Sequence, residues 1–394
     1  MPFCIAKPGL AYRELLGGRA RAAAALACAA WLVPAAVSAQ ASAPAATADA
    51  KAPAAPAAPA ASEPVPRWVG VPRVAGRLRA ADIGLVINTA DPYSVAVGEH
   101  YIAARGLDER QVLRLELPVR PVLSREEFER LRDAIDRRFG AGTQALALAW
   151  AAPYAVRCNA ITGALALGFD SALCRQTCGA TMASRYFNSA SARPYADHGL
   201  RPAMLLAAPD IEQARALIDR GVAADGSLAG GARPPVAALF LDTSDAARRV
   251  RRVLYPPPGP LAGTGVVAHS APAAALNQTP RVLLAVTGSL RLDLQPAPDW
   301  VPGALADHLT SVGGALQGTH GQSTVLEWIA SGATASHGTV SEPCNHLQKF
   351  PHPQLLLLHY LQGATAIEAY WKSVLWPQQS LFVGEPLAAP FARR

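Results

Sequence analysis

Apolar residues occur in short continuous runs after residue 80, and amphipathic segments separate them. The runs at 83–88, 145–150 and 282–286 are apolar at almost every position, which is typical of strands that are buried on both faces. This alternation predicts an α/β fold with a mainly parallel central sheet and helices on both faces. Further strands are predicted at 112–117, 204–207, 237–241 and 333–337, and helices at 94–104, 124–139, 210–220, 245–253 and 322–332. The Pro-rich stretch 255–280 is predicted to be a long surface loop.

The chain begins with a different pattern. Four basic residues and one acid occupy the first 21 positions, and an apolar run of about twelve residues and the small residues Val37-Ser38-Ala39 follow. This order is typical of a secretory signal peptide, and the run is shorter than the ~20 residues that span a bilayer. We therefore expect a signal peptide at 1–39, a mature chain that starts near Gln40, and a periplasmic or extracellular location.

Residues 40–80 are mostly Ala, Pro, Ser and Thr, a composition that cannot bury enough apolar surface to fold. We expect a disordered, Pro-rich linker there and a single α/β domain over 81–394. No later apolar run reaches 18 residues, so no membrane span is expected after signal cleavage. The formal net charge is +7, of which the signal segment contributes +3. Together with export, this modest remaining charge disfavours a nucleic-acid partner.

Cysteine usage follows from the expected compartment. Six cysteines are present, and four remain after cleavage: Cys158, Cys174, Cys178 and Cys344. An oxidising compartment favours disulfides, and four cysteines allow three pairings. One local bridge is expected among the first three, which lie close together in sequence. The remaining cysteine of that group either pairs with Cys344 or leaves a free thiol.

The segment 311–353 concentrates residues that carry chemistry. It contains Cys344, His337 and Glu342, which are the catalytic candidates for a thiol nucleophile with a nearby base. Two alternatives remain open: a structural role in which Cys344 is half of a disulfide, and a metal site. The metal site would use Cys344, His337, His346 and His352, although their spacing fits no standard zinc pattern. No cofactor-binding fingerprint is present, and no cofactor is expected.

A second set of candidates lies where the predicted strands end, because ligands of open parallel sheets bind there. These segments are rich in hydroxyl groups, Asp and Gly. They are 88–91, 151–154, 242–245, 287–289 and 311–314. Asp242 and Asp245 are equally typical of ordinary acids at a helix start.

Several motifs together resemble an uncharacterised family of exported bacterial proteins that accompany exosortase, a transpeptidase proposed to sort surface proteins. The resemblance spans about residues 80–391. It rests on Asp82–Asn88 with Asp91–Ser94, Ala149–Tyr154, Cys158, Ile161-Thr162, Gly168–Asp170, Gly338–Cys344, Lys349–Pro351, Glu368–Trp371 and Gly384–Ala388. It implies an accessory of surface sorting or envelope assembly, and not a sorted cargo, since the chain ends without an apolar sorting tail.

The carboxyl-terminal third is more distantly similar to the caspase-like fold of gingipain-type peptidases. The similarity rests on Ser331–Ala333, Gly363–Ala369 and Gly384–Pro386. Those enzymes carry a His-Gly and a Cys after two successive strands, whereas 287–289 and 309–311 here contain neither. The resemblance implies either a displaced catalytic pair or a loss of peptidase activity. We therefore expect an exported binding protein that recognises envelope proteins or peptides, with a thiol-dependent hydrolase as the alternative.

Overall fold

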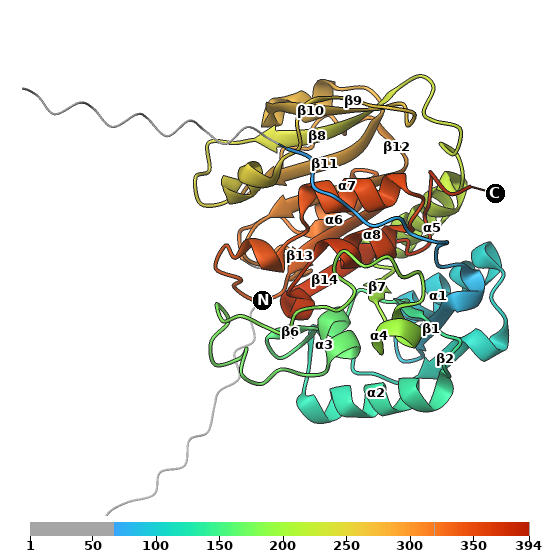
Figure 1. Ribbon diagram of the computed structural model, residues 1–394. Helices are drawn as coiled ribbons and strands as arrows, with labels where there is room; N and C mark the ends of the chain where they lie inside the picture. The colour runs from blue at the N-terminus through green and yellow to red at the C-terminus, as the bar shows by residue number, and fades with distance from the viewer. Residues whose placement is uncertain (1–66, 319, 394) are drawn as a thin grey trace, which may run out of the picture. The chain divides into compact units, whose positions relative to one another are not determined.

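The computed structural model describes residues 67–318 and 320–393 (Figure 1). The chain divides into two units, Met1–Ser62 and Glu63–Arg394, and all described residues belong to the second unit. The predicted signal peptide and most of the predicted linker lie outside the described residues. Residues 67–79 form no helix or strand, and the backbone N–H groups of Val69, Val74 and Leu78 donate to side chains of the domain. Among the described helices, none has the length and apolar character needed to cross a bilayer.

An eleven-stranded sheet organises this unit, with helices on both of its faces, so the predicted α/β class is confirmed. Its strands, in spatial order, are β2 (Val112–Leu115), β1 (Ile83–Asn88), β4 (Ala145–Leu148), β7 (Ala203–Leu205), β14 (Ser380–Gly384), β13 (Ala335–Thr339), β12 (Trp300–Leu309), β11 (Val282–Gly288), β8 (Val236–Asp242), β10 (Val266–Pro272) and β9 (Gly259–Leu261). A small second sheet contains β3 (Val122–Leu123), β5 (Ala155–Val156) and β6 (Asn159–Ala160). Every residue of β1 is buried, as its continuous apolar run predicts.

Most of the described helices begin where the sequence supplies a capping side chain. Asp91 caps α1 (Pro92–Arg105), and Ser124 forms a capping box with Glu127 at the start of α2 (Arg125–Arg138). The other helices are α3 (Ile161–Leu167), α4 (Pro194–His198), α5 (Ile211–Ala224), α6 (Val325–Ala330), α7 (Pro353–Leu361) and α8 (Ala366–Ser373). The helix predicted at 245–253 is instead a 3₁₀ segment, η3 (Arg249–Leu254). The predicted loop 255–280 contains β9, β10 and a second 3₁₀ segment, η4 (Ala273–Gln278).

Apart from β9, which pairs antiparallel with β10, the sheet consists of two parallel halves that run in opposite directions. β14 is parallel to β7 but antiparallel to β13, whereas β13, β12, β11, β8 and β10 are mutually parallel. The carboxyl ends of the two halves therefore lie at opposite edges. The predicted strand-end candidates are divided accordingly: 88–91 and 151–154 follow strands of the first half, and the remaining three segments follow strands of the second.

Candidate functional site

Three strands at the junction of the two halves bring Asp307, His337 and Ser380 together. Asp307 on β12 and His337 on β13 are direct partners in the parallel register. The imidazole Nδ1 lies 3.1 Å from Asp307 Oδ1, and Nε2 lies 2.9 Å from Ser380 Oγ at the start of β14. The antiparallel pairing of β13 with β14 makes this possible, because it places the beginning of β14 beside the end of β13.

Arg251 of η3 completes the group. Its Nη1 forms an ion pair with Asp307 Oδ2 and lies 3.2 Å from the carbonyl oxygen of Pro351, and its Nη2 donates to the carbonyl of Thr287 at 2.8 Å. All four side chains of this buried cluster (Arg251, Asp307, His337 and Ser380) are at most 1% exposed. A buried charge without a partner costs much free energy, so Arg251 and Asp307 can both be buried only because they pair with each other.

The protonation states follow from the same contacts. Burial acts to raise the pKa of Asp307, but the Arg251 guanidinium and His337 outweigh it and hold this pKa below its usual range. Burial lowers the pKa of His337, which is therefore neutral at pH 7. Because an ionised carboxylate only accepts hydrogen bonds, the ring proton belongs on Nδ1. Nε2 then accepts a hydrogen bond from the Ser380 hydroxyl.

This connectivity is that of a serine nucleophile, a histidine base and an orienting aspartate. Such a triad also needs space for a substrate at the hydroxyl group and the imidazole. Here Ser380 and His337 are fully buried, and Phe350 and Phe382 lie against the imidazole with ring centroids 6.1 Å and 5.4 Å away. In this conformation the cluster therefore acts as a buried ion-pair and hydrogen-bond network that joins β12, β13, β14 and η3.

The predicted nucleophile Cys344 lies on the loop after β13 and is bonded to Cys178, with a Cα–Cα distance of 5.1 Å. Glu342 is exposed, and its Oε1 accepts a hydrogen bond from the Cys344 backbone N–H at 2.8 Å. The structure thus brings Glu342 and Cys344 together, whereas both ring nitrogens of His337 are engaged by Asp307 and Ser380. The catalytic role of Cys344, His337 and Glu342 stays a prediction.

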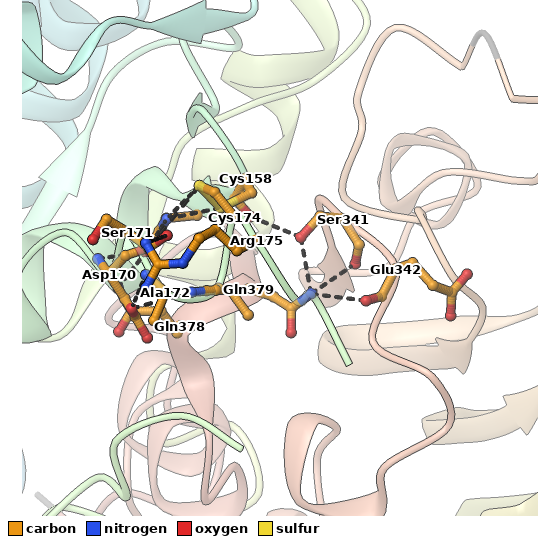
Figure 2. Close-up of a disulfide and its surroundings, with 12 residues drawn as sticks. Cys158, Asp170, Ser171, Ala172, Cys174, Arg175, Ser341, Glu342, Gln378 and Gln379 are labelled. Atoms are coloured by element: carbon orange, nitrogen blue, oxygen red, sulfur yellow. Dashed lines mark hydrogen bonds between the residues drawn. A yellow bond between two sulfur atoms is a disulfide. The ribbon is translucent and has the colours of Figure 1, made fainter. Parts of the chain in front are cut away.

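The second disulfide, Cys158–Cys174, also contacts the loop after β13 (Figure 2). Ser341 Oγ donates to the carbonyl of Cys158 at 2.7 Å, and Gln379 Nε2 donates to Ser341 Oγ at 2.8 Å. The loop after β13 is therefore held by the hydrogen bond from Ser341 to Cys158 and by the covalent bond between Cys344 and Cys178. This pairing corresponds to one of the alternatives that the sequence leaves open, a local bridge plus a long-range bridge to Cys344.

Metal coordination receives no support from the arrangement of donors. Across residues 67–318 and 320–393, no group of three or more His, Cys, Asp or Glu side chains is arranged to hold a metal ion. Of the predicted ligands, His346 packs against Trp376 with ring centroids 6.0 Å apart, and His352 caps the start of α7. These two contacts are structural roles.

Sequence reasoning identified His337 but missed Arg251, Asp307 and Ser380. The sequence feature that could have indicated Asp307 is a charged residue within a short, mostly apolar run, Gly303–Leu309. Such a residue faces the core of a sheet that is covered on both sides and therefore needs a buried partner. The partner itself has no local signature.

Comparisons of this chain with protein-family models, curated proteins and solved structures find no match. Inference about its function therefore depends on the site geometry and on the sequence resemblances described above.

Proposed function

We propose that this chain is an exported accessory protein that binds an envelope protein or peptide, within an exosortase-type surface-sorting or envelope-assembly system, and that it is not catalytic. One observation carries the proposal. The two groups required for thiol chemistry are both engaged elsewhere, since Cys344 Sγ is bonded to Cys178 and both nitrogens of His337 have buried side-chain partners. Only a thiolate attacks efficiently, and a disulfide sulfur is not one.

Export is supported by the cysteines. All four cysteines in the described residues are paired, and structural disulfides persist mainly in oxidising compartments. The predicted signal peptide agrees with this location. N-terminal sequencing of the protein from the periplasmic fraction tests it, and we expect a mature chain that begins near Gln40. A full-length chain retained in the cytoplasm contradicts export.

The non-catalytic part of the proposal is tested by thiol titration and active-site labelling. Mature protein purified without reductant and unfolded in guanidinium should give no iodoacetamide adduct, whereas the matched variant Cys178→Ser should give one adduct, at Cys344. A fluorophosphonate probe should leave Ser380 unlabelled in the folded protein. A native Cys344 thiol that reacts rapidly at neutral pH, or a labelled Ser380, overturns the proposal and favours a hydrolase.

A further inference from the structure

A pocket lies between the amino-terminal segment 67–79 (blue in Figure 1) and the last described residues of the chain. Its volume is about 710 Å³, which is within the usual range for ligand pockets. This volume corresponds to about 24 waters at about 30 Å³ each, so a single phosphate or sulfate ion fills only a small part of it. The pocket is lined by residues from five segments: 71–79, 228–231, 262–264, 361–363 and 391–393.

The charged residues that line this basic pocket are all arginines: Arg73, Arg77, Arg79 and Arg393. No described Asp or Glu lines it, and none of the four guanidinium groups forms an ion pair with a described carboxylate side chain. Arg73, Arg79 and Arg393 are exposed, and the half-buried Arg77 donates one N–H to the carbonyl of Arg393 at 3.4 Å, which leaves four N–H donors. A cleft that is lined by charges of one sign concentrates ions of the opposite sign. The basic pocket therefore favours a ligand with several negative charges.

Aliphatic and small residues form most of the remaining lining. The side chains of Val71, Val74 and Leu361 are only half-buried, so part of their apolar surface is accessible. The two uncharged polar side chains are already engaged with the backbone: Thr264 Oγ1 donates to a carbonyl at 2.8 Å, and the Gln362 amide binds the amino-terminal segment. Polar recognition in the basic pocket is therefore left to the arginines, and the aliphatic side chains can contact an apolar group.

The backbone that carries three of the four arginines is fixed on the domain. Gln362 Oε1 accepts a hydrogen bond from the Val74 N–H at 2.9 Å, and its Nε2 donates to the carbonyl of Pro72 at 3.1 Å. Farther along, Leu78 is 1% exposed, and its N–H donates to Glu368 Oε2 at 3.1 Å. A ligand therefore loses little binding energy to ordering this wall of the basic pocket.

From these observations we infer that the basic pocket binds an acidic peptide segment, in which Asp or Glu residues flank an aliphatic residue. A guanidinium can donate two parallel N–H bonds to one carboxylate, so the four arginines can hold several carboxylates along the segment. The aliphatic side chain then contacts Val71, Val74 and Leu361. An acidic polysaccharide has no such side chain and could use only the arginines. This inference rests on the proposed binding role and names the chemistry of the partner.

The test uses the mature, oxidised protein and the blocked peptide acetyl-Asp-Glu-Leu-Asp-Glu-amide, whose carboxylates carry all of its charge. Isothermal titration calorimetry at low ionic strength should show one site per chain, and binding should weaken at about 0.15 M salt, which screens charges. The analogue acetyl-Asn-Gln-Leu-Asn-Gln-amide lacks the carboxylates and should show no measurable binding. The analogue acetyl-Asp-Glu-Ser-Asp-Glu-amide should bind at least about three-fold more weakly, because it lacks the apolar contact.

Variants locate the site. Arg73→Gln/Arg79→Gln removes two exposed guanidinium groups of the basic pocket and should weaken binding of the acidic peptide by about five- to thirty-fold. The matched control Arg130→Gln/Arg137→Gln removes two exposed arginines of α2, which does not line the pocket. It changes the net charge equally and should bind within about two-fold of wild type, because distant exposed charges are screened. Thermal unfolding of each variant confirms that it is folded.

Three results would overturn the inference. The first is absence of binding of the acidic peptide at low ionic strength. The second is an equal loss of affinity in the two double variants, because the peptide then responds to net charge and not to the basic pocket. The third is binding of tetragalacturonate, a sugar chain with four carboxylates, as tightly as the acidic peptide, because the partner is then an acidic polysaccharide. These titrations do not depend on Cys344 or Ser380, so failure here is distinguishable from failure of the proposed function.

Discussion

Replacing Asp307 by Asn should destabilise the protein strongly, because it removes the charge that compensates Arg251. Both side chains are at most 1% exposed, and the pair lies at the junction of the two half-sheets. Removing one partner of a buried ion pair leaves the other charge uncompensated, which typically costs about 3–5 kcal/mol. The free energy of unfolding of Asp307→Asn should fall by about that amount. Arg251→Met should lose a similar amount, since it leaves a buried carboxylate and removes the donor to Pro351 and Thr287.

The double variant Arg251→Met/Asp307→Asn contains no buried charge in this cluster. Its main losses are the two hydrogen bonds from Arg251 to backbone carbonyls, together about 2 kcal/mol at about 1 kcal/mol each. The two single variants sum to about 6–10 kcal/mol, so the predicted coupling energy is at least about 4 kcal/mol. His337 keeps an acceptor, because an Asn carbonyl can take the place of Asp307 Oδ1.

Urea unfolding followed by circular dichroism at pH 7.5, without reductant, measures these changes. The control is Glu99→Gln, whose partner Arg114 forms an exposed ion pair at 2.8 Å; it should lose less than about 1 kcal/mol. If the loss of unfolding free energy in the double variant equals the sum of the losses in the two single variants within about 0.5 kcal/mol, the two charges do not compensate each other and the reasoning is refuted. A small effect of Asp307→Asn also refutes it, because a charge kept for catalysis at an open site can be removed with little loss of stability.

Two further predictions concern stability. The Cys178–Cys344 bond joins residues 166 apart, and the Cys158–Cys174 bond joins residues 16 apart. Replacing the cysteines by Ser should lower the free energy of unfolding in urea by about 5 kcal/mol for the first bond and about 3 kcal/mol for the second, because the longer loop loses more entropy when it is closed. A larger loss for the shorter loop contradicts this reasoning. Burial, with a smaller effect of a nearby lysine, lowers the pKa of His359 to about 3, whereas the unfolded chain binds this proton near its ordinary pKa of about 6.5. The stability contributed by neutral His359 is therefore present above about pH 6.5 and is lost as the pH falls, by about 2 kcal/mol at pH 5. The free energy of unfolding of His359→Gln should depend less on pH by this amount. An unchanged pH dependence contradicts the prediction.

Much of the fold could be predicted because the buried strands carry their own signal. β1 has the predicted bounds, 83–88, since a strand covered on both faces must be apolar at nearly every position. β14 was missed. It has only five residues, and a short apolar run does not reveal the direction in which a strand pairs. The sequence predicts a loop over β10 because the stretch 255–280 is rich in proline. β10 lies near the edge of the sheet and several of its residues are exposed, so it has no continuous buried apolar run.

The site was predictable only where its chemistry is local. His337 was placed on a short strand of small residues, and the structure has it in β13. Its partners Asp307 and Ser380 are 30 and 43 residues away in sequence. No pattern within one segment links them, because the contact depends on the crossing from β12 to β13 and the return of the chain into β14. Cys344 was noted for its residue type, but its pairing with Cys178 depends on a chain separation of 166 residues.

The reversal of direction between β14 and β13 limits where a ligand can bind. Because the carboxyl ends of the two halves lie at opposite edges, strand-end residues of one half cannot complete a site at the carboxyl edge of the other. At the edge where β13 ends, the first half of the chain is attached instead by the disulfide between Cys178 and Cys344, which lies on the loop after β13. That bond tethers the loop leading to Phe350 and Pro351, which contact His337 and Arg251 of the buried cluster. The disulfide and the buried cluster are therefore connected through one loop, which runs from the Cys178–Cys344 bond to the residues that contact His337 and Arg251.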